Sequence, residues 1–219
     1  MKLRLASAIL LVVLMFSLST TGVTAQSYSF QVPQEVVHAY WNSDGTLALD
    51  YTIVFANDSG AHVIDFVDVG MPNGSYDFGS ISADVNGAPV AVSRDFQGDG
   101  PYGFAVDMGS YAIQPGQSGQ VHVYVGRISD MIYPDDDEPD TYVSGELSPA
   151  YWTTARGATN LTVIFHLPPG IQPNEPRYHP ARGGWPCDTA PAIGYDDQQR
   201  VQYAWSCTSA NAYTRYTFG

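Results

Sequence analysis

The chain has 219 residues, in which 22 aspartates and glutamates outnumber nine lysines and arginines and give a formal charge of −13. Lys2 and Arg4 are the only cations before residue 26, so residues 26–219 hold seven arginines, no lysine and a formal charge of −15. Nucleic acids and anionic lipid surfaces are bound by clustered lysine and arginine, so this composition argues against both classes of partner.

Residues 1–25 have the pattern of a secretory signal peptide. Lys2 and Arg4 precede the apolar run Leu5–Leu18, and small residues follow up to Ala25. An uncleaved membrane anchor is the weaker alternative, because this run is shorter than the roughly 20 apolar residues that cross a bilayer. We therefore expect cleavage after Ala25 and an exported domain, extracellular or at the cell surface, that spans residues 26–219.

The rest of the chain has the alternation of strands rather than the periodicity of helices. Apolar residues recur at every second position and are interrupted by Gly, Pro, Asn and Asp, which is typical of short strands and turns. Asn86-Gly87 is the strongest hairpin signal, because both residues tolerate a positive φ. Strands are expected at residues 47–55, 62–69, 81–85, 88–92, 121–125, 161–167, 201–207 and 213–218.

This spacing of strands predicts an all-β fold, an antiparallel β-sandwich of the immunoglobulin-like kind. The length suits either one enlarged sandwich or two small sandwiches packed together. If there are two units, their seam is expected near residues 133–145, where the chain is acidic. A single unit is favoured, since no Gly/Ser-rich or Pro-rich linker separates the halves.

Several stretches resemble parts of known surface proteins. The runs Ile113–Val125 and Leu161–Gly170, together with Asn42–Gly45 before a long strand, resemble the exported N-terminal immunoglobulin-like β domain of uncharacterised bacterial membrane and surface proteins. The resemblance implies a surface-exposed β domain of unknown activity with no catalytic residues to carry over. In that family a transmembrane region follows the β domain, and the lack of such a segment in the given sequence departs from that pattern. Residues 213–219 end in a strand pattern with no stop or anchor, so we expect the natural protein to continue beyond Gly219.

Cys187 and Cys207 are expected to form one disulfide. An even and minimal number of cysteines in an exported chain favours a disulfide. A zinc site is a poorer reading because no paired histidines lie nearby, and the spacing differs from that of a redox CxxC motif.

One acidic loop is a candidate calcium site. Its carboxylates are Asp135, Asp136, Asp137, Glu138 and Asp140. Calcium takes six to eight oxygen ligands, and carboxylates crowded in one loop repel each other unless a cation lies among them. A solvated loop is the plainer alternative. Asp95 and Asp99 form a second, weaker acidic patch that lacks the spacing of an EF-hand.

The sequence predicts a non-catalytic extracytoplasmic surface or binding domain, part of a longer cell-envelope protein, whose ligand is an unidentified protein or polysaccharide. The alternative is a carbohydrate-binding or carbohydrate-hydrolysing module, for which Trp185, in a loop beside Cys187, is the best exposed stacking candidate. No nucleophile elbow or paired histidine motif is present. His122 and His166 are expected on the solvent face of their strands.

Overall fold

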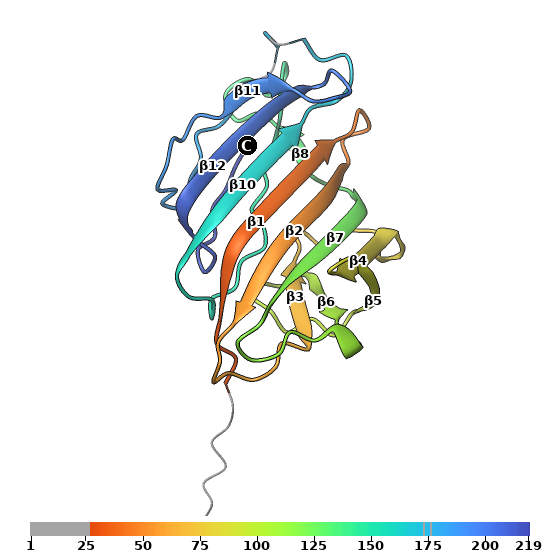
Figure 1. Cartoon of the computed structure of the whole chain (residues 1–219). Coiled ribbons are helices and arrows are strands. Elements are labelled where there is room, and N and C mark those ends of the chain that lie inside the picture. Colours follow the sequence, from red (N-terminus) through yellow and green to blue (C-terminus); the bar gives the residue numbers. More distant parts are fainter. Residues whose placement is uncertain (1–26, 173, 176) are drawn as a thin grey trace, which may run out of the picture.

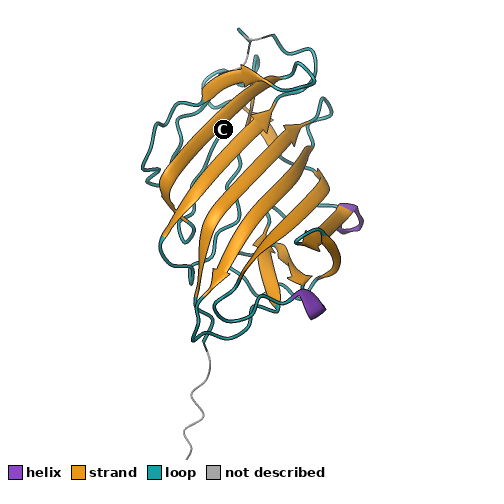
Figure 2. Cartoon of the chain, viewed as in Figure 1, coloured by secondary structure: helices purple, strands orange, loops and turns teal. Residues whose placement is uncertain are grey.

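The computed structural model describes residues 27–172, 174–175 and 177–219, so the predicted signal peptide lies outside the described residues. Strands dominate the described part of the chain, whose helical content is two short 3-10 turns (Figure 2). The strands are β1 Phe30–Trp41, β2 Leu47–Asn57, β3 Phe66–Gly70, β4 Ile81–Val85, β5 Ala88–Ser93, β6 Gly103–Asp107, β7 Ser118–Ile128, β8 Ile132–Pro134, β9 Val143–Gly145, β10 Ala158–His166, β11 Ala192–Tyr195 and β12 Val201–Asn211.

Ten of these strands form one large sheet, in the order β11-β12-β10-β1-β2-β7-β4-β5-β6-β3, and β8 pairs with β9 in a small second sheet. Figure 1 shows β12, β10, β1, β2 and β7 as one broad front layer, with β3 and β6 behind its lower part. The predicted all-β sandwich is thus confirmed. One feature differs from the expected antiparallel pairing, because β1 and β10 run parallel.

The turn between β4 and β5 shows how local chemistry sets the register. Asn86 and Gly87 have φ values of 52° and 83°, and β4 pairs with β5 on both sides of them. A two-residue turn with positive φ at both positions matches the twist of the strands that it joins. The hairpin predicted from Asn86-Gly87 is therefore confirmed.

One face of the large sheet is buried, because its strands alternate as the sequence predicts. In β12, Val201, Tyr203, Trp205 and Cys207 are buried, and the residues between them are less so. The described core is one continuous cluster that includes strands on both sides of residues 133–145. Where the sequence predicted a seam, the structure has the small β8–β9 sheet.

The disulfide between Cys187 and Cys207 is confirmed, and it fastens the loop before β11 to β12. Within the described residues, no helix is long and apolar enough to cross a membrane.

Candidate functional site

A cleft of about 360 Å³ opens on the surface of the molecule. Its first wall comes from the end of β3 and the loop before β6, at residues 70–72 and 99–101. Its second wall comes from the segment 146–151 and from Arg182, Arg215 and Thr217. A cavity of this size lies at the lower end of the range for small-molecule sites.

The second wall is built from three segments joined by backbone hydrogen bonds. Leu147 and Phe218 exchange bonds of 2.8 and 2.9 Å, and Arg182 and Thr217 exchange bonds of 2.9 and 3.3 Å. Gly183 allows the close approach, because a Cβ there would lie 2.3 Å from the carbonyl oxygen of Arg215. Its φ of +79° is likewise a conformation that favours glycine. The chain near its last described residues is therefore held in a fixed position at the cleft.

Trp185 supports this wall from inside, and the expectation of an exposed ring was wrong. The side chain is only 7% exposed. Its ring packs edge-on against Tyr216 and Phe218, at centroid distances of 5.1 and 5.0 Å, and its Nε1 donates to the carbonyl oxygen of Asp188. A ring enclosed in this way offers no flat face to a sugar, so the stacking role predicted for Trp185 finds no support here.

Charged and hydroxyl groups from both walls face the cleft. Asp99 accepts hydrogen bonds from the backbone N–H and the hydroxyl of Thr153, at 2.9 and 3.0 Å. Arg182 forms an ion pair with Glu146. The hydroxyls of Ser148 and Thr217 lie 2.9 Å apart and share a hydrogen bond. Arg215, which is exposed, completes the set.

Arg215 differs from every other arginine in the described part of the chain. Arg127, Arg156, Arg177, Arg182 and Arg200 form ion pairs with carboxylates, and Arg94 lies over the ring of Phe78. Among the described residues, Arg215 has neither an ion pair nor an aromatic partner. In a chain with so large an excess of carboxylates, an unpaired guanidinium at a cleft is the group most available to an anionic ligand.

The predicted calcium loop does not gather its carboxylates. Asp135 accepts hydrogen bonds from the backbone N–H groups of Asp137 and Glu138 and from the Ser144 hydroxyl, and these bonds lower the pKa of its carboxyl, the Ser144 bond most strongly. Asp136 and Asp140 are exposed. Across the described ranges, no three His, Cys, Asp or Glu side chains are placed to hold a metal ion. Calcium binding at residues 135–140 stays a prediction without geometric support.

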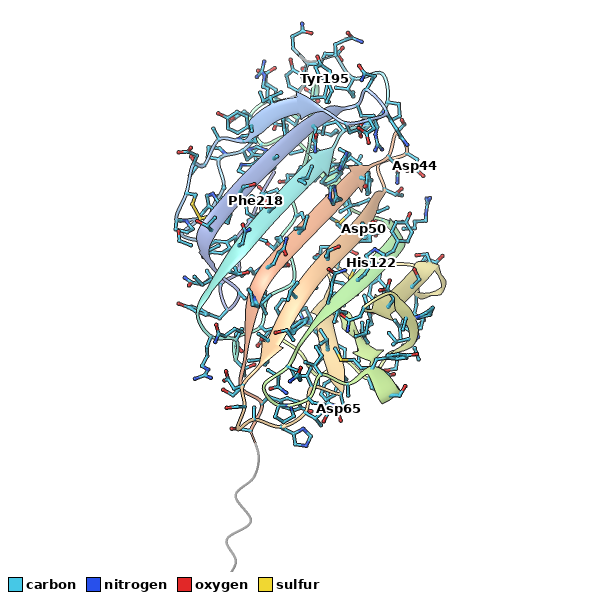
Figure 3. The ribbon with its side chains drawn as sticks, in the orientation of Figure 1. Asp44, Asp50, Asp65, His122, Tyr195 and Phe218 are labelled. Carbon is cyan, nitrogen blue, oxygen red and sulfur yellow. A yellow bond between two sulfur atoms is a disulfide. The ribbon has the colours of Figure 1, made fainter. Side chains whose placement is uncertain are left out.

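A second polar feature, which the sequence analysis missed, crosses the front face of the sheet. Figure 3 shows two of its members, Asp50 and His122, side by side on that face. We call it the outer-face row, and it consists of Asp84, His122, Asp50, His38, His166, Asp196 and Arg200, which come from β4, β7, β2, β1, β10 and the β11–β12 turn.

His122 joins three strands of the row. Its ring nitrogens lie 2.9 Å from Asp84 and 2.9 Å from Asp50. Burial lowers the pKa of His122, but the hydrogen bonds and charges of Asp84 and Asp50 outweigh burial and raise it above the ordinary value. As the imidazolium, this residue donates to both carboxylates and neutralises part of their charge.

The other end of the row holds two neutral histidines. His166, expected on a solvated face, is only 5% exposed, since Tyr40 stacks on its ring at 4.3 Å. Burial lowers the pKa of both His38 and His166. Asp196 has a pKa of about 2: burial raises it, but hydrogen bonds from Arg200 and His166 outweigh burial. Spacing along the chain could not reveal the row, because its members meet only through strand register.

Glu35 is a buried carboxyl on the core side of β1. Its side chain is 1% exposed, and its Oε1 has no hydrogen-bond partner among the described residues. Burial raises the pKa of Glu35 to about 8, so the carboxyl keeps its proton at neutral pH. We assign Glu35 no chemical role.

Comparison with known proteins shows the fold. No protein-family model matches the sequence, and no curated protein matches it. Among solved structures, a mutant M1 zinc metallopeptidase from Deinococcus radiodurans matches with 12% identity and a TM-score of 0.51, over 87% of this chain and 42% of the other. A two-domain M1 zinc metallopeptidase mutant bound to L-tryptophan matches with 12% identity and a TM-score of 0.52, over 89% of this chain and 43% of the other.

The chain therefore spans less than half the length of the structures that it matches. At this identity the likeness establishes a shared fold and nothing about activity.

Proposed function

We propose that this chain is a non-catalytic binding domain of an exported protein, and that its fold is the one that M1 zinc metallopeptidases use for part of their length. The observation that carries the proposal is the match of nearly nine-tenths of this chain to less than half of those enzymes.

The cleft at Arg215 supports the binding part of the proposal. It is concave, Met71 on its first wall and Tyr151 on its second wall add apolar surface, and a few polar groups converge on it. These are the general features of ligand sites in proteins. The disulfide supports the export part, because disulfides persist in oxidising compartments.

Hydrolysis assays test the non-catalytic role. Purified residues 26–219 are incubated with amino-acid 4-nitroanilides, with and without added Zn²⁺, beside an M1 metallopeptidase as positive control. We expect no release of nitroaniline by this chain under either condition. Zinc-dependent turnover that survives further purification would show that the domain is catalytic.

Mass spectrometry tests the export. The full sequence is expressed with its leader in a bacterial host, and the protein outside the cytoplasm is isolated. We expect a mature N-terminus at Gln26 and a formed disulfide. Retention in the cytoplasm with residues 1–25 still attached would contradict the proposed location.

A further inference from the structure

The cleft at Arg215 combines one unpaired cation with apolar surface on both of its walls, and this combination defines a class of ligand. We infer that the cleft binds an organic monocarboxylate, whose carboxylate pairs with Arg215 and whose apolar body lies against Met71 and Tyr151. The inference rests on the proposed function, since it names the ligand class of the binding domain.

Charge is the first argument for a carboxylate. Arg215 is the arginine of the described chain whose guanidinium meets neither a carboxylate nor a ring. A guanidinium presents paired N–H donors that match a carboxylate in a bidentate arrangement. We therefore expect the carboxylate of the ligand to be the partner that Arg215 lacks in the described chain.

The other lining groups restrict the ligand to a single negative charge. Asp99 and Glu146 also line the cleft, and Glu146 is already neutralised by Arg182. Asp99 is held by Thr153, and no cation of the described chain forms an ion pair with it. The single charge of a monocarboxylate is neutralised by the guanidinium of Arg215. The second negative charge of a dianion such as phosphate would be repelled by the carboxylate of Asp99.

Hydroxyl groups add hydrogen-bonding capacity next to Arg215. Ser148 and Thr217 share one hydrogen bond, so the second hydroxyl hydrogen of the pair is available to a ligand oxygen. Both hydroxyls lie on segments fixed by the Leu147–Phe218 and Arg182–Thr217 bridges. The polar end of the cleft is thus formed before any ligand arrives, which limits the entropy lost on binding.

The ligand could be a free small acid or the C-terminal carboxylate of a peptide, and the test separates the two. Residues 26–219 are titrated at millimolar concentrations with 3-phenylpropionate, its uncharged amide, inorganic phosphate, and one tripeptide with either a free or an amidated C-terminus. Binding is followed by chemical-shift changes of the backbone amides. We expect 3-phenylpropionate to shift the backbone amides of residues 146–148, 150–151 and 215–217, and we expect at least tenfold weaker binding of the uncharged amide and of phosphate.

The variant Arg215→Gln should weaken binding of 3-phenylpropionate by about tenfold or more, as expected for loss of a charge-assisted hydrogen bond. Arg215→Lys should give an intermediate loss. Arg127→Gln, which removes an exposed arginine outside the cleft, is the matched control and should bind as the wild type does. Melting temperatures establish that each variant folds.

Three results would overturn the inference: equal binding of acid and amide, unchanged binding in Arg215→Gln, or no binding of any carboxylate at millimolar concentration. Binding of the free acid alone identifies a small-molecule site, whereas binding of the tripeptide that requires its free C-terminus identifies a peptide site, and both support the inference. None of these outcomes depends on the hydrolysis assay, so failure here leaves the non-catalytic role standing.

Discussion

Nδ1 of His38 lies 2.9 Å from Nε2 of His166, and the ionised Asp196 fixes which nitrogen donates. Asp196 can only accept, so Nδ1 of His166 donates to it at 2.8 Å and Nε2 of His166 holds a lone pair. His38 must therefore donate from Nδ1. A carboxylate at the end of the row thus sets the tautomers of two rings in succession.

The histidines of the outer-face row should titrate in opposite directions. We expect the imidazole proton resonances of His38 and His166 to titrate below pH 6.5 and those of His122 above it, in agreement with their pKa shifts. The fold gains stability from His38 and His166 above pH 6.5 and loses it as the pH falls through their folded pKa values. The contribution of His122 is present below pH 6.5 and is lost as the pH rises through its raised pKa.

Thermal unfolding checks the same point. His38→Gln should reduce the loss of melting temperature between pH 7 and pH 5, and His62→Gln, at a histidine outside the row, is measured beside it as the comparison. Titration of His38 and His166 at or above the ordinary value would contradict the assigned tautomers.

Glu35→Gln should stabilise the protein at high pH. The folded Glu35 keeps its proton to about pH 8, whereas the unfolded carboxyl ionises near its ordinary value. The folded state therefore holds one proton more between these pH values, and stability falls by about 1.4 kcal/mol per pH unit as the pH rises. Urea unfolding from pH 5 to pH 9 should show a flatter profile for Glu35→Gln. Asp95→Asn, at an exposed carboxylate, is the control and should keep the wild-type slope.

Trp185→Ala should cost about 3–5 kcal/mol of the free energy of unfolding, the range for removal of a large buried aromatic side chain. Trp185→Phe should cost less, because it keeps a ring against Tyr216 and Phe218 and loses the hydrogen bond to Asp188. Tyr195→Ala, at a tyrosine that is 55% exposed, serves as control in the same urea titration. Loss of polysaccharide binding in Trp185→Ala with unchanged stability would instead restore the sugar-stacking role.

Replacement of Cys187 and Cys207 together by alanine should lower the free energy of unfolding by roughly 3 kcal/mol, as the chain-entropy account gives for a loop of this length. A reductant should destabilise the wild type similarly and leave the double variant unchanged. The unfolded, unreduced wild type should show no reactive thiol. One or more titratable thiols would mean that the bond is absent.

Gly183→Ala and Gly184→Ala form a matched pair. Both positions have positive φ, +79° and +75°, but a Cβ at Gly184 meets nothing within 4 Å. Each alanine carries the cost of a left-handed conformation, about 1–2 kcal/mol. Gly183→Ala should be further destabilised and should shift the amide resonances of residues 215–217, because it must displace the Arg215 carbonyl. Equal effects of the two substitutions would show that the loop moves freely.

The strands with regular alternation could be predicted from the sequence, and β1 could not. The register of β1 with β2 shifts at a bulge between Gln31 and Gln34, and the polar residue Glu35 occupies a buried position. The period-2 pattern of apolar residues is therefore interrupted within β1. The C-terminal run at residues 213–218 has the opposite character. It alternates like a strand but makes isolated bridges at Thr217 and Phe218.

The functional features depended on contacts distant in sequence. Arg215 stands out as unpaired only once the partners of the other arginines are known from the structure. The cleft is lined by segments that are more than a hundred residues apart in the sequence. The acidic run at residues 135–140 is evident in the sequence, but the Asp135 carboxylate accepts hydrogen bonds from the backbone of its own loop. The disulfide is the one of these long-range contacts that the sequence predicts, because two cysteines allow a single pairing.

The parallel pairing of β1 with β10 has a consequence for the order in which the chain can fold. Residues 34–40 can pair with β2 early on one edge, but their other edge stays unpaired until residues 160–166 are available. The strands β2, β7, β4, β5, β6 and β3 find partners within residues 47–128. Until β10 arrives, the middle of the future sheet is an open edge, which is a template for pairing with other chains. Closure over so long a separation is slow, so the time before β10 joins β1 is the interval in which this protein is most exposed to misassembly.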